Sequence, residues 1–215
     1  LILFPAFFAE SSQPVNVIGS SAGAFRSACF VQRDPVAAIN RLAENYSQTV
    51  YSPKPGPGEI THKARELIDY VMGRNGVMEV LTNRRFKLHV IAARCHGLMQ
   101  HYGRYRQMLG LGVSAAANTM NRRLLKKLYT RSVFSAPDSE LQINDPYQLN
   151  TEFIKLGFNN VKDALLASGS IPLVIDGVER MVAAPEGMYR DGGIIDYHFD
   201  LSFGPQDGLV LYPHF

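Results

Sequence analysis

Short apolar runs alternate along the chain with longer stretches in which apolar residues recur every three or four positions. Runs of four to eight apolar residues are typical of buried strands, and the wider spacing is typical of amphipathic helices. We expect strands over residues 1–4, 15–18, 86–93, 132–135, 153–156 and 208–212. We expect helices after residue 20, from Asp34-Pro35 onward, and over 60–71, most of 105–129, and 159–167. This alternation predicts an α/β fold built in layers around a largely parallel sheet.

The stretch 15–30 joins one of these strands to a helix through the sequence G-S-S-A-G. A strand, then G-x-S-x-G, then a helix is the context of a nucleophile elbow, in which the serine hydroxyl projects above the sheet edge from a tight turn. Ser21 is therefore our candidate nucleophile. We expect glycine at Gly19 and Gly23 because a Cβ at either position would collide with the neighbouring strand and helix. The alternative is a glycine- and serine-rich turn that carries no chemistry.

Composition narrows the function classes. With 215 residues, 46% of them hydrophobic, the chain can bury one sizeable core, so we expect a single domain over 1–215. The net charge of +3 is far below that of a strongly basic domain, so nucleic acid is not an expected partner. Cys29 and Cys95 are too few and too far apart for a disulfide framework, and the spacing of His96 and His101 suits no metal site. We therefore expect no metal.

The helix expected over 105–129 is interrupted by Gly110 and Gly112 and ends in a basic run, N-R-R-L-L-K-K-L-Y. Its cations, stacked in pairs one helical turn apart, are Arg122, Arg123, Lys126 and Lys127. This face is either solvated, as most such faces are, or a surface that rests on anionic lipid. No stretch approaches 18 consecutive apolar residues, so we expect no bilayer-spanning segment and a cytoplasmic or membrane-peripheral protein.

The connection between the first two expected strands is unusually short. Ten residues, 5–14, separate them, and their sequence P-A-F-F-A-E-S-S-Q-P is a poor helix. A parallel crossover needs about a dozen residues or more, usually including a helix. The sequence therefore predicts that residues are missing near positions 4–14, and we expect the domain to be incomplete at both ends as well.

A serine alkoxide does not form unaided, so Ser21 needs a base within hydrogen-bond reach. One alternative is an α/β-hydrolase triad of serine, acid and histidine, although that fold places several strands before its nucleophile. The other candidate base is Asp191, which Gly192 and Gly193 follow. Such a carboxylate lies on a tight turn whose small residues let another backbone come close. An isolated D-G-G is more typical of an Asx turn, but its pairing with an early G-x-S-x-G favours a catalytic site.

Three segments together resemble the patatin-like phospholipases. G-S-S-A-G-A at 19–24 and D-G-G at 191–193 look like that family's two catalytic motifs, and A-L-L-A-S-G-S-I-P at 164–172 is similar to its A-x-x-A-S-x-A-x-P segment. The resemblance implies a three-layer α/β sandwich and a lipid acyl hydrolase with a Ser-Asp dyad and no cofactor. It implies that Ser21 attacks a phospholipid or other lipid ester, that Asp191 is the base, and that the amide of Ala22 serves the oxyanion hole.

Two segments depart from the family pattern. The family has a glycine-rich loop with an arginine after its first strand, whereas residues 5–10 here read P-A-F-F-A-E. The family often has N-x-P after D-G-G, and the matching residues here are Tyr197, His198 and Phe199. Losing an oxyanion donor costs about 10²–10³ in kcat. Three functions stay open: the lipid acyl hydrolase, a non-catalytic lipid-binding or regulatory relative, and an α/β-hydrolase fragment with His198 or His214 as the histidine.

Overall fold

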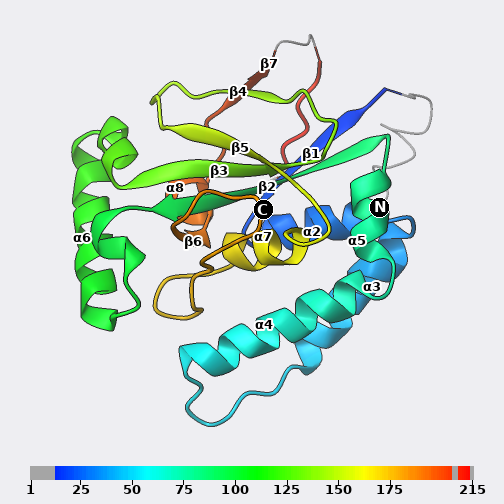
Figure 1. Cartoon of the computed structure of the whole chain (residues 1–215), viewed down its shortest axis with the longest axis horizontal. Coiled ribbons are helices and arrows are strands. Elements are labelled where there is room, and N and C mark those ends of the chain that lie inside the picture. Colours follow the sequence, from blue (N-terminus) through cyan, green and yellow to red (C-terminus); the bar gives the residue numbers. More distant parts are fainter. Residues whose placement is uncertain (1–12, 205–207, 214–215) are drawn as a thin grey trace.

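A computed structural model describes residues 13–204 and 208–213 (Figure 1). Its centre is a five-stranded sheet in the order β1-β2-β3-β5, with β6 also paired to β2. The strands are β1 (Val15–Ser20), β2 (Phe86–Cys95), β3 (Tyr129–Ser135), β5 (Thr151–Lys155) and β6 (Met188–Asp191). A separate two-stranded sheet pairs β4 (Gln142–Asn144) with β7 (Ser202–Gly204), and Figure 1 draws it above the central sheet.

The central sheet carries a parallel pair at each edge, β1 with β2 and β3 with β5. The long strand β2 is antiparallel to β3 on one flank. On its other flank β2 pairs with two strands in turn, first with β1 and then, further along, with the antiparallel β6. The α/β class is confirmed, with helices around a central sheet in an arrangement compatible with three layers.

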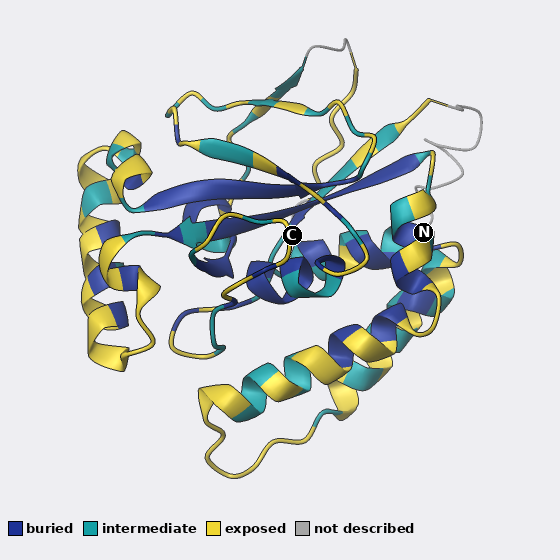
Figure 2. Cartoon of the chain, in the orientation of Figure 1, coloured by how far each residue is buried: buried dark blue, intermediate teal, exposed yellow. Residues whose placement is uncertain are grey.

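One group of helices lies on one face of this sheet, drawn below it in Figure 1. They are α2 (Ala22–Phe30), α3 (Pro35–Gln48), α4 (Pro57–Met72), α5 (Gly76–Thr82) and α7 (Val161–Ser168). Leu88 and Val90 of β2 point into the core that α2, α4, α5 and α7 form with the sheet. Because side chains alternate along a strand, the intervening residues face the other side. Figure 2 shows β2 and β3 as buried over nearly their whole lengths.

The opposite face carries a second core and the elements that surround it. These elements are the 3₁₀ helices η1 (Gly97–Gln100) and η2 (Arg122–Lys127) and the helices α6 (Arg104–Met120) and α8 (Gly193–Asp196). Ala93 and Cys95 of β2 pack there with Met99, Leu125 and Ile195. Within 13–204 and 208–213, every helix is too short or too polar to span a bilayer.

The helix expected from Asp34 is confirmed, including its cap: the Asp34 carboxylate accepts the Ala37 N–H at 2.9 Å. The interruption expected at Gly110 and Gly112 is wrong, since α6 runs through both residues. An interior glycine costs a helix only about 1 kcal/mol. At Gly110 the missing Cβ also makes room, because a Cβ there would lie 2.6 Å from Met99 Sδ.

Three further expectations concern the ends of the chain and the basic run. Residues 208–212 are described but form no strand, so that prediction is wrong; Leu209 is 98% exposed, and an apolar composition without a partner edge does not make a strand. The strand expected over 1–4 lies outside the described residues. Residues 122–127 form a 3₁₀ helix rather than the end of an α-helix, so the expected pairing of cations four positions apart does not hold there.

Candidate active site

Ser21 and Asp191 meet because two strands end against each other on one flank of β2. The last residue of β1, Ser20, is paired with Ile91, and the last residue of β6, Asp191, is paired with the next residue, Ala92. Since β1 runs parallel and β6 antiparallel to β2, their carboxyl ends face one another. This register brings together two side chains that lie 170 positions apart in the sequence.

Ser21 occupies the turn between β1 and α2. Its backbone has φ 53° and ψ −129°, a conformation that non-glycine residues rarely adopt and that persists only when the surroundings enforce it. The hydroxyl does not cap the helix that follows. Instead, Ser21 Oγ donates a hydrogen bond to Asp191 Oδ2 at 2.6 Å. This short distance is typical of a hydroxyl bonded to a carboxylate.

The conformation of Ser21 is held by the end of α7. The Ser21 N–H donates to Ser168 Oγ at 2.9 Å, and Ser168 Oγ donates in turn to the Ile91 carbonyl at 2.6 Å. Ser168 is fully buried. The same segment holds the other side of the pair, since the Asp191 N–H donates to the Ser170 carbonyl at 3.0 Å and the Gly192 N–H to the Ser168 carbonyl at 3.3 Å. The segment 168–170 therefore holds both Ser21 and Asp191 in place.

Sequence reasoning gave Ser168 no role. The segment 164–172 was singled out for its resemblance to a family motif, and that was the available signal. What the spacing along the chain could not indicate is that the hydroxyl of Ser168 lies between the β2 backbone and the amide of Ser21.

We predict that Ser168→Ala lowers kcat more than its effect on folding explains. Removing the hydroxyl leaves a buried N–H and a buried carbonyl unpaired, which costs about 1–3 kcal/mol in the free energy of unfolding. It also frees Ser21 to shift, and a displacement of about 1 Å at a reacting group can cost about 10²-fold in rate. Urea titration and ester-hydrolysis kinetics would measure the two effects.

Ser135→Ala is the matched control. Ser135 is also a buried serine at the end of a secondary-structure element, in this case β3. Its hydroxyl contacts the His89 ring at 3.0 Å, away from the site. This variant should lose stability and keep its kcat. Equal kcat values for the Ser135 and Ser168 variants would reduce Ser168 to an ordinary packing residue.

The Asp191 carboxyl is 5% exposed, and this burial raises its pKa above the usual range. Two hydrogen bonds act in the opposite direction, the one from the Ser21 hydroxyl and one from the Gly193 N–H to Asp191 Oδ1 at 2.7 Å. Both carboxylate oxygens therefore have a donor, and one of these donors is the serine itself. The carboxyl group is poised to bind a proton more readily than an exposed aspartate.

Two of the four glycines expected to shape the site are required by close packing. A Cβ on Gly19 would lie 2.6 Å from the backbone N and Cα of Ala24. A Cβ on Gly192 would lie 2.5 Å from Ser20 Oγ and also overlap the Ile91 carbonyl. The expectation for Gly23 is wrong: nothing lies within 4 Å of a Cβ there, because this position in the first turn of α2 faces open space. At Gly193 the nearest atom is Asp191 Oδ1, at 2.9 Å.

Backbone donors for a developing oxyanion are present at the start of α2. The first N–H groups of a helix have no acceptor within the helix, and Ala22 and Gly23 are its first two residues. Both follow Ser21 directly. The segment near 4–14, where the sequence lacks the family's glycine-rich loop, falls for the most part outside the described residues.

The histidines do not join this pair in the described contacts. His198 is exposed, with its ring 4.9 Å from that of Tyr197, and His214 lies outside the described residues. His89 is buried in β2 between Ser135 Oγ and Asn16 Oδ1, and burial lowers its pKa to about 4. Within 13–204 and 208–213, no three His, Cys, Asp or Glu side chains are grouped as metal ligands.

The basic run divides between two environments. Arg122 is half-buried: its guanidinium donates to the Ile195 carbonyl and lies 3.5 Å from the Asp196 carboxylate and 5.1 Å from the Tyr147 ring. Arg123, Lys126 and Lys127 are exposed. Arg122 therefore braces α8, the helix that follows Asp191, and the other three cations remain at the surface.

A buried ion pair fixes α8 more firmly. Arg131 of β3 contacts both carboxylate oxygens of Asp196, at 2.5 and 2.8 Å, and also the Asp145 carboxylate at 2.8 Å. Arg131 and Asp196 are almost completely buried, so removing either partner would leave an uncompensated charge. The turn after Asp191 is thereby tied to β3, the strand on the other flank of β2.

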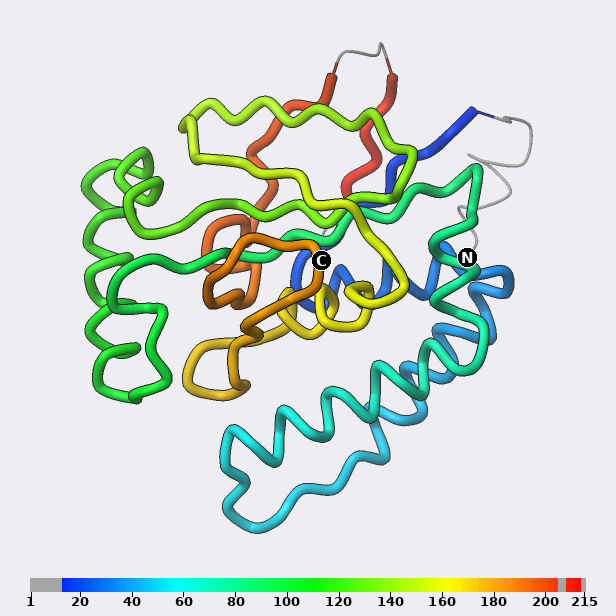
Figure 3. The backbone as a smooth tube through the Cα atoms, viewed as in Figure 1, coloured from blue at the N-terminus to red at the C-terminus, as the bar shows by residue number. Residues whose placement is uncertain are grey.

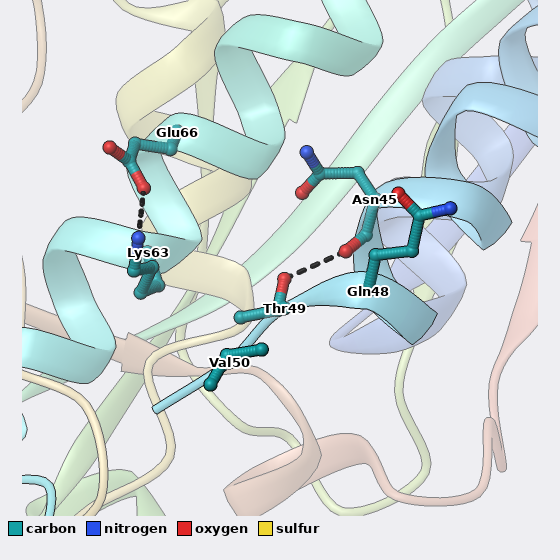
Figure 4. Close-up of a pocket in the computed structure, with 6 residues that line it drawn as sticks. All are labelled: Asn45, Gln48, Thr49, Val50, Lys63 and Glu66. Atoms are coloured by element: carbon teal, nitrogen blue, oxygen red, sulfur yellow. Dashed lines mark hydrogen bonds and ion pairs between the residues drawn. The ribbon is translucent and has the colours of Figure 1, made fainter. Parts of the chain in front are cut away.

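The surface hollow in Figure 4 offers no competing chemistry. It lies between the end of α3 and α4 and is lined by Asn45, Gln48, Thr49, Val50, Lys63 and Glu66. Its polar groups bind each other: Lys63 Nζ lies 2.9 Å from Glu66, and Thr49 Oγ1 donates to the Asn45 carbonyl at 2.7 Å. A larger hollow beside Gln32 and Arg41 likewise includes neither Ser21 nor Asp191.

Comparison with known proteins adds no relative. No family model, no curated protein and no solved structure matches this chain.

Proposed function

We propose that this protein is a serine hydrolase of carboxylic esters in lipids, with Ser21 as the nucleophile and Asp191 as its base. The observation that carries the proposal is the 2.6 Å hydrogen bond from Ser21 Oγ to Asp191 Oδ2. A nucleophile and its base within hydrogen-bond reach are the signature of covalent acyl transfer. The strand–turn–helix around Ser21, with its positive φ, supports a nucleophile elbow at this position.

Acylation begins when Ser21 Oγ attacks the ester carbonyl carbon and its proton passes to Asp191 Oδ2. The resulting oxyanion is stabilised by the backbone N–H of Ala22 and by the positive end of α2. As the carbon–oxygen bond to the alcohol breaks, the protonated Asp191 returns its proton to the leaving oxygen. The products of this half are a free alcohol, such as a lysolipid, and an acyl-serine.

Deacylation reverses the same roles with water. Asp191 removes a proton from a water molecule, whose oxygen attacks the acyl carbonyl, and the proton then returns to Ser21 Oγ as the fatty acid leaves. Asp191 suits both halves, because burial raises its pKa towards the range in which a group can both accept and donate a proton. The mechanism uses no metal and no organic cofactor.

Two arguments favour this dyad over the other functions considered. Asp191 bonds the serine directly, whereas a histidine triad places an imidazole between acid and serine. The lipid class rests on the resemblance of 19–24, 164–172 and 191–193 to the patatin-like phospholipases. The geometry adds support to that resemblance, because the middle segment contributes Ser168, which bonds Ser21.

Hydrolysis of p-nitrophenyl esters and of phosphatidylcholine, measured side by side, tests the proposal. The wild-type protein should release nitrophenol and fatty acid, and Ser21→Ala should release neither. Ser47→Ala, an exposed serine on α3, is the matched control and should keep full activity. Vesicle binding without hydrolysis by the wild type would favour the non-catalytic alternative, and activity in Ser21→Ala would refute the nucleophile.

We predict an acid limb in the pH profile of kcat/KM. Asp191 must be ionised to accept the Ser21 proton, so activity rises as the pH rises through the pKa of Asp191 and then levels. Burial places that pKa above the value of about 3.9 of an exposed aspartate. A profile with its midpoint at or below that ordinary value would contradict the assignment of the base.

A further inference from the structure

The helix α6 departs from the usual side-chain pattern of a surface helix. Its fully buried residues are Gln107, Gly110 and Ser114, and Leu111 and Ala117 are partly buried against the second core. Gln107 Nε2 donates to the Tyr102 carbonyl at 2.8 Å, and Ser114 Oγ is 2.7 Å from the Tyr129 hydroxyl. The fully buried positions of α6 are thus small or polar, whereas the buried face of an amphipathic helix is normally apolar.

The outward face of α6 is apolar. Residues three or four positions apart share a face of a helix, and the exposed large side chains follow this spacing. They are Tyr105 (88% exposed), Met108 (52%), Leu109 (60%), Val113 (42%) and Met120 (80%), which we call the α6 outer face. No charged residue occurs over 107–121. Figure 2 shows α6 largely in the colour of exposed residues. A contiguous apolar patch of this kind marks an interaction site.

Cations border the α6 outer face. Arg104 and Arg106 are exposed and flank Tyr105, about 100° to either side of it around the helix. Arg123, Lys126 and Lys127 follow on η2, also exposed. No Asp or Glu occurs anywhere over 80–137. From other elements, Asp176 and Glu179 act on the hydroxyl of Tyr102, before α6 begins. The helix therefore joins apolar side chains to a basic border.

The α6 outer face is connected to the candidate active site. The Leu173 N–H donates to Gln107 Oε1 at 3.1 Å, which ties the segment after Ser170 to α6; Figure 3 shows this segment beside the helix. Ile171 and Val174 in it are 47% and 41% exposed. The carbonyl of Ser170 accepts the Asp191 N–H. Exposed apolar side chains thus extend from α6 to Ile171, which follows Ser170, the residue whose carbonyl holds the Asp191 N–H.

We propose that the α6 outer face docks on a phospholipid bilayer that contains anionic lipid. An apolar face bordered by Arg and Lys is the pattern of an interfacial helix, whose apolar side chains enter the headgroup region while its cations reach the anionic headgroups. The border of this face carries cations and no Asp or Glu over 80–137, so its charge matches that of anionic headgroups and favours a lipid surface over a protein groove. The inference deepens the proposed lipid activity, since it brings the site to its substrate.

Vesicle flotation with the Ser21→Ala protein tests this docking without hydrolysis. Vesicles of phosphatidylcholine with about one third phosphatidylserine should bind it, and those of phosphatidylcholine alone should bind it less. Leu109→Glu/Met120→Glu should weaken binding at least tenfold, since each change puts a charge into the interface. Arg104→Gln/Arg106→Gln should weaken it about thirtyfold on anionic vesicles, which corresponds to about 1 kcal/mol for each of the two cations. Val50→Glu/Phe158→Glu, at similarly exposed positions elsewhere, is the matched control and should bind normally.

The outcomes separate docking from catalysis. Binding that is absent in the parent protein, or lost equally in the control double variant, overturns the docking proposal. A dimer in solution that Leu109→Glu/Met120→Glu dissociates would also overturn it, in favour of a second copy of the chain as the occupant. Hydrolysis of soluble esters without vesicle binding would support the proposed function and overturn the docking. Vesicle binding by the parent protein, together with no hydrolysis by the wild type, would support the docking and overturn the proposed function.

Discussion

Ser21→Ala is expected to abolish ester hydrolysis, and Asp191→Asn to reduce kcat by about 10²–10⁴-fold, the usual contribution of a general base. The Asn side chain keeps the shape of the site: its oxygen can accept the Gly193 N–H, as Asp191 Oδ1 does at 2.7 Å. It cannot take the proton of Ser21. Steady-state kinetics on a soluble ester would measure both variants.

The same Asp191→Asn change is expected to raise the stability of the protein relative to the wild type as the pH rises. Burial raises the pKa of Asp191 in the folded protein above its unfolded value. The stability that this group contributes is therefore fully present below the unfolded pKa and is lost as the pH rises through the folded pKa. The asparagine side chain does not ionise, so the variant does not lose stability in this way. Melting temperatures over a pH series that starts near the unfolded pKa of about 3.9 should show the variant gaining on the wild type as the pH rises.

Asp69→Asn supplies the control for this pair of effects. Asp69 is a surface carboxylate, 63% exposed, that pairs with Lys162. Its replacement should leave kcat unchanged and should not reproduce the pH-dependent gain in stability. If Asp191→Asn retained full turnover, or lost stability as the pH rose, the buried carboxylate would not be the base that the mechanism requires.

Gly19→Ala and Gly23→Ala are expected to have opposite effects, although both glycines belong to the same G-x-S-x-G. A Cβ at Gly19 would lie 2.6 Å from the backbone of Ala24, so β1 and α2 must separate. Overpacking of this kind costs about 1–3 kcal/mol in the free energy of unfolding, and more where backbone cannot move. The shift also displaces Ser21, so activity should fall with stability.

Gly23→Ala meets no atom within 4 Å and lies inside α2. Replacing glycine by alanine in a helix is worth up to about 1 kcal/mol, so this variant should equal or exceed the wild type in stability. Urea unfolding of the two variants together provides the comparison. A Gly23→Ala protein that is less stable than Gly19→Ala would contradict the account of the turn.

Local signals in the sequence predicted much of the fold. The run over 15–18, the cap at Asp34 and the β-branched stretch over 86–93 each gave an element that the structure contains. These predictions worked because the cap and the strand composition are local properties. Residues 208–212 have the same kind of composition without a partner strand, which the sequence could not reveal.

The two main residues of the candidate site could be predicted from the sequence, but the residues that hold them in place could not. The motifs around Ser21 and Asp191 indicated the pair, and the register of β1 and β6 on β2 explains why they meet. The role of Ser168 depends on where α7 ends over β2, which is a tertiary fact. The exposed apolar face of α6 could not be predicted for the same reason, because spacing shows which residues share a face of a helix and not which face packs on the sheet.

Covalent labelling with a fluorophosphonate, followed by peptide mass spectrometry, tests the central claim most directly. The account predicts one label per folded chain, carried by Ser21, with a labelling rate that falls strongly in Asp191→Asn while Ser47 remains unlabelled. A label on another residue, or no label on the folded protein, would contradict the assignment of Ser21 as a nucleophile activated by Asp191.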